Sequence, residues 1–310
     1  MKLIKPKFWD KENSLIALLL SPLSLVTELI IFIKRKIILP SNFNIPIVCI
    51  GNIYLGGTGK TPLSILVAKE LKKKKKNNAI VRKYYPDHID EYDLIKESFQ
   101  NLITNSYRED AINEAKLNGY DGVILDDGFQ DFKINKDLSI LCFNSSQLIG
   151  NGFLIPAGPL RESLNAIRRA NVIVINGNKI LNFEKRVHKI NKNIKFFYSK
   201  YKLENVRRFK NKKILAFAGI GNPENFFDLL EENNLDLKKK IIFPDHYKFE
   251  RKELLKIISF AKKNRLKIIT TEKDYYRIKE FKLRDINFLK LNLEIKNKKK
   301  LINGILKIYN

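Results

Sequence analysis

The chain has 310 residues, which is long enough for two ordinary domains with separate cores. Its 44% hydrophobic and 11% aromatic content is typical of a globular protein and excludes a disordered chain. The formal net charge of +26 suggests an anionic partner, such as nucleic acid, a phosphate-bearing substrate or an acidic membrane surface, although a genome rich in lysine codons would also explain much of the excess.

The first predicted element is the apolar stretch SLIALLLSPLSLVTELIIFI, residues 14–33, which contains a single charge. Its length would just span a bilayer, but Lys34-Arg35-Lys36 follows where a secretory signal would have a cleavage site. On a helix the polar residues share one side, and Pro22 interrupts the middle. We therefore predict a helix that lies in the membrane interface, with a transmembrane span and a soluble core helix as the alternatives.

Short apolar strands alternate with helical stretches over residues 41–200. The helix at 62–71 has helical apolar spacing and begins with Pro62 in its first turn. Strands are predicted at 45–50, 78–85, 121–127, 138–144 and 170–176. This alternation predicts an α/β fold with a parallel sheet covered on both faces. The glycine-rich loop GNIYLGGTGKTP after the first of these strands makes the predicted fold the P-loop NTPase type. Cys49 and Cys142 lie within two of the strands and are expected to be buried, reduced thiols.

A second, smaller α/β domain is predicted in the C-terminal part of the chain. The extended stretches 194–206 and 286–295 bracket it and form a two-stranded linker. Between them the sequence predicts strands at 213–220, 239–244 and 267–274, with helices from Asn225 and from about Glu250. The predicted organisation is a membrane-associating helix (1–40), a first α/β domain (41–200), the second domain with its linker strands (201–295) and a C-terminal helix (296–310). We expect the cleft between the domains to admit a large substrate.

The loop GNIYLGGTGKTP, residues 51–62, follows the strand at 45–50 and opens a helix. It matches the phosphate-binding pattern G-x-x-x-x-G-K-[ST] except that Tyr54 stands at the first glycine. Glycine-rich backbone can wrap closely around phosphates, and the helix N-terminus favours their negative charge. Lys60 would neutralise the phosphates, and the Thr61 hydroxyl would bind Mg²⁺. The residues expected to bind ATP are Tyr54, Leu55, Gly56, Gly57, Thr58, Gly59, Lys60 and Thr61.

An acidic pair ends the apolar strand in VILDDGFQ, residues 123–130. P-loop enzymes use a carboxylate at such a strand end to hold Mg²⁺, which assigns Asp126 to the metal. Asp127 would join the metal shell or orient a substrate group. The dipeptide Asp-Gly is also common in turns, so the acidic pair indicates a metal site only in combination with the phosphate loop.

Several motifs together resemble the tetraacyldisaccharide 4′-kinase family, the membrane-associated enzymes of the lipid A pathway. GNIYLGGTGKTP, ILDDGFQ, GNGFLIPAGPLRESL and FPDHY occur in this order, and AGIGNPENFF and TTEKD extend the likeness over most of the chain. The family's own loop commonly lacks the first glycine, so Tyr54 is no obstacle to nucleotide binding.

The resemblance implies transfer of the ATP γ-phosphate to the 4′-hydroxyl of a tetraacyldisaccharide 1-phosphate, giving lipid IVA. The implied cofactors are ATP and Mg²⁺, and the implied partners are the acylated lipid and a membrane surface. The implied location is the cytoplasmic face of the inner membrane, with peripheral or monotopic attachment. Arg161 is expected to clamp a phosphate, Glu162 to lie near the metal or the sugar, and Gln130 to contact the acceptor sugar.

The resemblance also implies an Asp–His pair for accepting the proton. Asp90 in the loop IDEY would be the base, and His246 in FPDHY would orient it from the second domain. This sequence departs from the family around Asp90, where Ile89 replaces a glycine and Tyr92 replaces a proline. The alternatives for the base are Glu91 and Asp93, and His88 is a rival for the histidine.

Two other classes of function compete with a lipid kinase. The positive charge suggests a P-loop ATPase acting on nucleic acid, but the sequence shows no RNA-binding motif or array of stacking aromatic residues. A nucleotide-dependent membrane switch would use the loop and the metal carboxylate but not a carboxylate–histidine pair. We therefore expect no nucleic-acid partner, and no obligate protein partner is evident from the sequence.

Overall fold

The computed structural model of this chain describes residues 6–245 and 247–309. His246 lies outside the described residues. The chain divides into two compact units. The larger unit contains residues 6–84, 99–200 and 293–309, and the smaller unit contains 85–98 and 201–292. Residues 85–98, which were predicted to belong to the domain at 41–200, are therefore grouped with the smaller unit.

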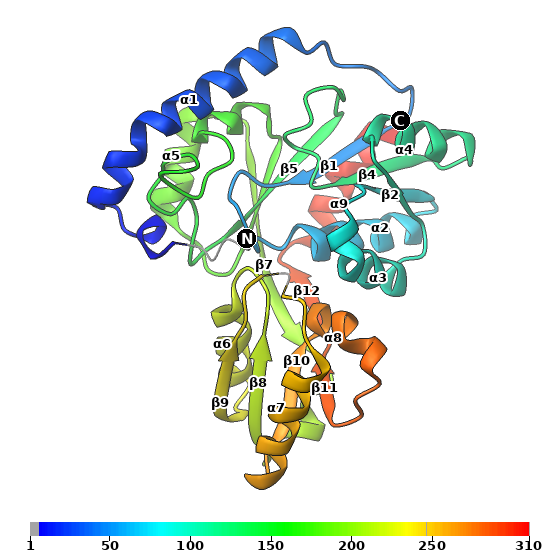
Figure 1. Cartoon of the computed structure of the whole chain (residues 1–310). Helices are drawn as coiled ribbons and strands as arrows, with labels where there is room; N and C mark the ends of the chain where they lie inside the picture. The colour runs from blue at the N-terminus through cyan, green and yellow to red at the C-terminus, as the bar shows by residue number, and fades with distance from the viewer. Residues whose placement is uncertain (1–5, 246, 310) are drawn as a thin grey trace. The chain divides into compact units, whose positions relative to one another are not determined.

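The larger unit is built on an eight-stranded sheet with the order β12-β7-β6-β5-β1-β4-β2-β3 (Figure 1). Its strands are β1 (Ile47–Gly51), β2 (Asn78–Lys83), β3 (Leu102–Asn105), β4 (Gly122–Asp126), β5 (Leu138–Asn144), β6 (Val172–Asn176), β7 (Lys195–Leu203) and β12 (Leu291–Ile295). The six pairs from β7 to β3 are parallel. Every residue of β1, β4 and β5 is buried, as expected for strands covered on both faces.

The helices of the larger unit are α1 (Leu15–Ile37), α2 (Lys60–Lys73), α4 (Arg108–Leu117), α5 (Leu181–Ile190) and α9 (Lys298–Leu306). Both α2 and α4 pack on β2 and β4, near the β3 edge of the sheet. Cys49 and Cys142 are free thiols buried in this core, as predicted. Burial raises the pKa of the Cys49 thiol to about 12, so it stays protonated.

Helix α1 is long and apolar enough to cross a membrane by length and composition, yet one side of it is docked on the larger unit (Figure 1). Ser24 Oγ donates to the Leu154 carbonyl over 2.7 Å and accepts from the Ala157 N–H over 3.2 Å. Ala17 is buried, and Ile31 packs against the core cluster. Because Ala17, Ser24 and Ile31 are spaced by seven residues, they share one face of the helix.

Most of the remaining apolar side chains of α1 are exposed. Leu15 is 79% exposed and Leu19 is 80% exposed, and only 11% of the most apolar window of α1 is buried. A core helix of a soluble protein would bury its leucines, so the structure contradicts that alternative. The exposed apolar face of α1 makes it a candidate membrane-associating helix.

The smaller unit is an α/β unit with a four-stranded sheet in the order β11-β10-β8-β9. Its elements are α3 (Ile89–Ser98), β8 (Lys213–Ala218), α6 (Pro223–Glu232), β9 (Asp236–Ile242), α7 (Arg251–Lys263), β10 (Lys267–Thr271), α8 (Glu272–Ile278) and β11 (Ile286–Leu289). The three strand pairs of this sheet are parallel. The chain passes between the units within β7 and β12, and also at residues 84–85 and 98–99. The strands β7 and β12 are neighbours in the eight-stranded sheet, whereas β11, the first part of the predicted stretch 286–295, belongs to the four-stranded sheet.

Two local predictions in this part of the chain were wrong. The stretch 267–274 was expected to be a strand throughout, but β10 ends at Thr271 and α8 begins at Glu272. The Thr271 hydroxyl accepts the Asp274 N–H over 3.1 Å, which is the N-cap that starts the helix. Asp90 was expected in a loop, but it lies in the first turn of α3.

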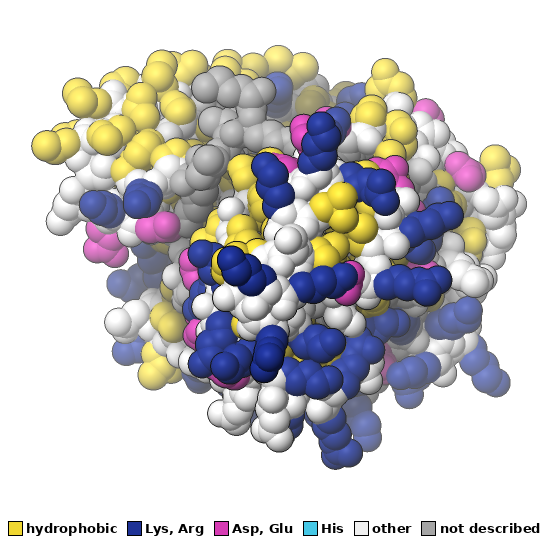
Figure 2. All heavy atoms as spheres, turned by 60° about the horizontal axis from the view of Figure 1, so that its bottom comes forward, with side chains coloured by type: hydrophobic (Ala, Val, Ile, Leu, Met, Phe, Trp, Pro, Cys, Tyr) yellow, Lys and Arg dark blue, Asp and Glu magenta, His cyan; other side chains and the backbone are white. Residues whose placement is uncertain are grey.

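Part of the excess positive charge lies on the edge strand β9. Lys238, Lys239 and Lys240 follow one another there and are all exposed. Figure 2 shows lysine and arginine side chains scattered over one face of the molecule, with fewer acidic side chains among them. Charged side chains on an edge strand prevent it from pairing with another sheet, so these lysines have a use that requires no anionic partner.

Candidate active site

The phosphate loop leaves the C-terminal end of β1 and leads into α2, as the sequence predicted. Gly56 has φ +113° and Gly59 has φ +89°, so these two positions need the left-handed conformation that glycine adopts freely. Tyr54 is buried, is not among the residues with positive φ, and forms an isolated bridge with Leu160. The position of the missing glycine is therefore an ordinary extended one here, which explains why a tyrosine is tolerated.

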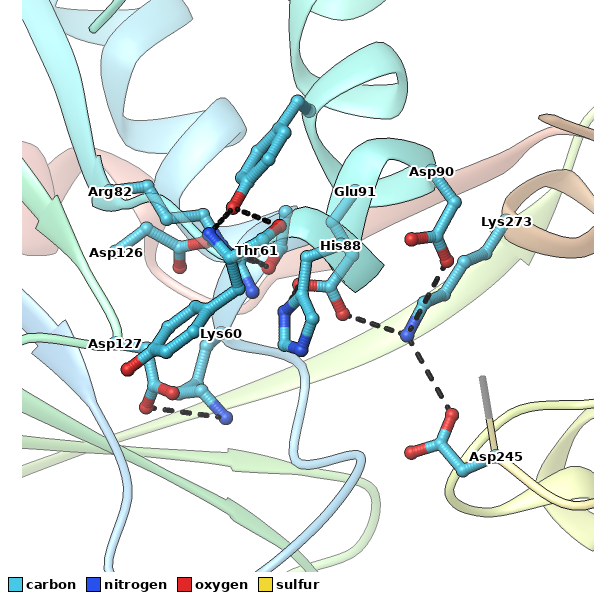
Figure 3. Close-up of polar contacts among 12 residues, drawn as sticks. Lys60, Thr61, Arg82, His88, Asp90, Glu91, Asp126, Asp127, Asp245 and Lys273 are labelled. Carbon is cyan, nitrogen blue, oxygen red and sulfur yellow. Dashed lines mark hydrogen bonds and ion pairs between the residues drawn. The ribbon is translucent and has the colours of Figure 1, made fainter. Parts of the chain in front are cut away.

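Asp126 lies at the end of β4, beside the end of β1, because Ile50 and Asp126 are partners in the parallel register. Its carboxylate is fully buried and accepts hydrogen bonds from Thr61 Oγ1 and Ser64 Oγ, each over 2.9 Å. Arg82, at the end of the neighbouring β2, forms an ion pair with the same carboxylate (Figure 3). The first turn of α2 is thereby joined to the strand that carries the acidic pair.

Asp127 follows with φ +60° and is turned toward two cations. Arg161 Nη1 donates to its carboxylate over 3.0 Å, and Lys60 Nζ lies 3.7 Å from Oδ1. Burial raises the pKa of the Asp127 carboxyl, but Lys60 and Arg161 outweigh it and hold that pKa below its usual range. Burial lowers the pKa of Lys60, and Asp127 opposes this. The two predicted phosphate-binding cations thus meet at one carboxylate.

Arg161 reaches this place because its chain segment runs beside the start of the phosphate loop. The Leu55 N–H donates to the Pro159 carbonyl over 2.8 Å, and the Arg161 N–H donates to the Ile53 carbonyl over 2.7 Å. The segment that contacts α1 at Leu154 and Ala157 thus continues directly into the phosphate site.

Gln130 and Glu162 lie together, but they are engaged with the protein itself. Gln130 Nε2 donates to Glu162 Oε1 over 3.1 Å and to the Asn52 carbonyl over 2.8 Å. The other oxygen of Glu162 pairs with Arg169, whose guanidinium lies over the Phe129 ring at 4.4 Å. Glu162 is buried, and through Gln130 this arrangement holds the Asn52 carbonyl at the start of the phosphate loop. The roles predicted for Gln130 with the sugar and for Glu162 with the metal stay predictions.

The donor set beside the loop fits Mg²⁺. Within residues 6–245 and 247–309, no group of three or more His, Cys, Asp or Glu side chains is placed to hold a metal ion. Mg²⁺ does not need such a group, because it is commonly bound through one or two protein oxygens together with waters and substrate phosphates. Thr61 Oγ1 and the Asp126 carboxylate, which are in contact, supply oxygens of that kind.

A second polar cluster lies in the smaller unit around Asp90 (Figure 3). Arg277, on α8, donates from Nε to Asp90 Oδ2 over 2.8 Å, and its Nη2 lies 2.7 Å from the same oxygen. Lys273 Nζ lies 2.7 Å from Glu91 Oε1 and 3.7 Å from Asp245 Oδ1. Burial lowers the pKa of Lys273, and the carboxylates of Asp245 and Asp90 oppose the change. Helix α8 thus orients the acidic residues that begin α3.

The alternatives to Asp90 occupy different environments. Asp90 is buried, whereas Asp93 is exposed on α3. Glu91 contacts Lys273 and lies 3.5 Å from His88 Nδ1. The predicted pairing of Asp90 with His246 falls partly outside the described residues and stays a prediction.

Sequence reasoning missed four residues that organise the two clusters: Arg82, Ser64, Lys273 and Arg277. Arg82 could have been found, because β2 and β4 were both predicted and parallel neighbours end at the same edge of a sheet. Ser64 lies one helical turn after Lys60, on the same side of α2. Lys273 and Arg277 share a helix face at i and i+4, but the predicted strand at 267–274 concealed that spacing.

Comparisons with known proteins agree over nearly the whole chain. The family model described as tetraacyldisaccharide-1-P 4′-kinase matches residues 16–310. The tetraacyldisaccharide 4′-kinase of Pelagibacter ubique is 40% identical over 314 residues, with 99% of each chain covered. That of Rickettsia canadensis is 35% identical, with 96% of this chain and 95% of the relative covered.

Among solved structures, the “apo” form of LpxK from Aquifex aeolicus in complex with ATP matches with a TM-score of 0.73 at 22% identity. The match covers 96% of this chain and 100% of that chain. At this identity the likeness concerns the fold, which the two chains share.

Proposed function

This chain belongs to the tetraacyldisaccharide-1-P 4′-kinase family, and on that premise we propose that it transfers the γ-phosphoryl group of ATP to the 4′-hydroxyl of a tetraacyldisaccharide 1-phosphate. The observation that carries the proposal is that the phosphate loop contacts the acidic end of β4: Thr61 contacts Asp126, and Lys60 pairs with Asp127. The product in this proposal is lipid IVA, an intermediate of lipid A synthesis. The family does not favour a nucleic-acid ATPase or a membrane switch.

In this proposal the loop from Tyr54 to Thr61 holds the ATP phosphates. The Gly56 and Gly59 conformations support a backbone curved around the ligand, and the N-terminus of α2 adds its favourable dipole. Lys60 and Arg161 then exchange their contacts with Asp127 for the phosphates. Mg²⁺ would be held by Thr61 and Asp126, with Asp127 nearby, and would neutralise charge on the phosphates.

The acceptor hydroxyl must lose a proton as its oxygen bonds to the γ-phosphorus and the bond to the β-phosphate oxygen breaks. We assign the acceptance of that proton to Asp90, with ADP as the leaving product. The pairing with Arg277 supports this assignment, because it fixes the direction of a buried carboxylate. Its His246 partner remains part of the proposal.

We further propose that α1 attaches the protein to the cytoplasmic face of the inner membrane without crossing it. Ser24 bonds the Leu154 carbonyl, and Ile31 packs on the core, so a spanning helix would have to abandon these contacts. The opposite side of α1 is apolar, and Lys34, Arg35 and Lys36 end the helix near anionic lipid headgroups. An acylated acceptor would be met at that surface.

The membrane proposal predicts that the triple substitution Leu15→Ser, Leu18→Ser and Leu19→Ser weakens binding to anionic lipid vesicles by about 100-fold or more. Each buried leucine contributes on the order of 1.5–3 kcal/mol, and 1.4 kcal/mol corresponds to a factor of ten. Vesicle co-sedimentation measures the change. The control is Leu117→Ser, which alters an equally exposed leucine at the end of α4. Unchanged vesicle binding by the triple variant would contradict the attachment, and protease cleavage on both sides of a bilayer would indicate a span.

The catalytic proposal predicts that purified protein, ATP and Mg²⁺ convert detergent-dispersed tetraacyldisaccharide 1-phosphate to a product heavier by one phosphoryl group. Mass spectrometry of the lipid, with fragmentation to locate the new phosphate, makes the measurement. A reaction without Mg²⁺ and one without ATP serve as controls. If ATP is hydrolysed while the lipid is unchanged, the transferase assignment fails.

A further inference from the structure

Asn52 cross-links the phosphate loop through its side chain. It directly follows β1 and is fully buried. Its Nδ2 donates to Thr58 Oγ1 over 2.9 Å and to the Gly56 carbonyl over 3.3 Å. The two contacts join the entry of the loop to residues four and six positions further on.

The chemistry of these partners fixes the orientation of the Asn52 amide. A backbone carbonyl can only accept a hydrogen bond, so the –NH₂ group must face Gly56 and Thr58. On the other side, Asn52 Oδ1 is buried and accepts no hydrogen bond within the part of the chain that the structure describes. Buried acceptors normally receive a hydrogen bond, and Oδ1 of Asn52 does not. The two bonds donated by Nδ2 are therefore what fixes the position of this side chain.

The backbone of Asn52 is itself anchored. Its carbonyl accepts from Gln130 Nε2 over 2.8 Å, and Gln130 also donates to Glu162. Glu162 pairs with Arg169, which lies over the Phe129 ring. A chain of polar contacts thus runs from Arg169 through the buried Glu162 to the backbone of Asn52 and holds it in place.

The loop needs such a cross-link because its glycine-rich backbone is flexible by itself. Three glycines among four residues, at 56, 57 and 59, leave the backbone many conformations in solution. A phosphate site works best when its N–H groups are already directed at the ligand, since no reorganisation is then needed on binding. Fixing Gly56 and Thr58 from one buried amide provides that order.

We propose that Asn52 is the positioning residue that holds the phosphate loop in its nucleotide-binding shape, acting through Gly56 and Thr58. The inference rests on the proposed use of ATP. It adds to that proposal a residue that need not touch the nucleotide itself.

The test compares Asn52→Ala with Asn78→Ala in full-length protein. Asn78 is also a fully buried asparagine that donates to a backbone carbonyl, that of Lys76, but it lies at the start of β2. Asn52→Ala should raise the KM for ATP and the Kd for a fluorescent ATP analogue roughly 10- to 100-fold, the range expected for two lost hydrogen bonds. Asn78→Ala should lower the melting temperature with little change in either constant.

A double-mutant cycle with Thr58 sharpens the test. Thr58→Val removes the hydroxyl that accepts from Asn52, and Thr58→Ser keeps it, so Val should weaken ATP binding more than Ser. If the pair acts together, Asn52→Ala and Thr58→Val combined should cost clearly less than the product of their separate effects. If the effect of the double variant on the Kd for ATP equals the product of the two single effects, the proposed coupling between Asn52 and Thr58 is wrong.

The outcomes separate this inference from the proposed function. If wild-type protein binds the ATP analogue but phosphorylates no lipid, the kinase assignment fails while the Asn52 effect on binding still decides the inference. If Asn52→Ala lowers the melting temperature as Asn78→Ala does and leaves ATP binding unchanged, Asn52 is only structural and the inference is wrong. Failure of the wild type to bind ATP would overturn both.

Discussion

Lys60→Ala and Asp126→Ala are each expected to lower the turnover number by about 10²-fold or more. In the proposed mechanism Lys60 stabilises charge that develops on the phosphates, and Asp126 holds the Mg²⁺ that does the same. Removing either one costs a few kcal/mol of transition-state stabilisation. Steady-state kinetics with saturating ATP and acceptor lipid measure the effect.

Controls must separate chemistry from folding, because Asp126 is buried against Arg82 and its loss leaves that cation without its carboxylate. Asp126→Asn keeps the size and removes the charge, and its melting temperature shows whether the fold is retained. Lys72→Ala changes an exposed lysine of the same helix as Lys60 and should leave turnover near the wild-type value. Near-normal turnover of both Lys60→Ala and Asp126→Ala would refute the site.

Asp90→Asn is expected to reduce turnover by about 10²- to 10⁴-fold while ATP binding stays nearly unchanged, since a general base typically contributes that much to rate. Asparagine is preferred to alanine because Arg277 then keeps an oxygen to bind. If His246 acts with Asp90 as a unit, His246→Ala should cost a comparable factor. The double variant should then be little worse than the worse single variant.

Neighbouring carboxylates provide the matched series for this prediction. Glu91→Gln removes the negative charge nearest to Lys273 but keeps an oxygen there, and Asp93→Asn alters an exposed residue two positions further along α3. Both should retain far more activity than Asp90→Asn. A variant of Glu91 or Asp93 that abolishes turnover, beside an active Asp90→Asn, would show that the base has been misassigned.

The parts of the fold that sequence predicted best are those set by local pattern. The apolar strands before Asn52 and Asp127 and the glycines at 56 and 59 each carry their own signal within a few residues. Lys60 and Thr61, at the start of α2, and Asp126, at the end of β4, come together because β1 and β4 are parallel neighbours in the sheet. The polar side of α1 was predicted as well, but its docking on the segment at Leu154 and Ala157 was not.

The parts that sequence did not predict depend on contacts between distant segments. Nothing within the segment IDEY indicates that Asp90 would be held by Arg277, 187 residues further along the chain. Helix α3 is completed by packing against α8, a tertiary contact that overrides weak local propensity. Likewise, the partners of Glu162 are Gln130 and Arg169, which lie 32 and 7 residues away in the sequence.

The discontinuous smaller unit has a consequence for synthesis on the ribosome. Asp90 and Arg277 are 187 residues apart, and at about 5–20 residues per second translation needs roughly 10–40 s to connect them. During that interval α3 emerges without α8, and the last strand and helix of the larger unit have not yet been made. Neither unit therefore has all of its elements until the C-terminal residues have been synthesised.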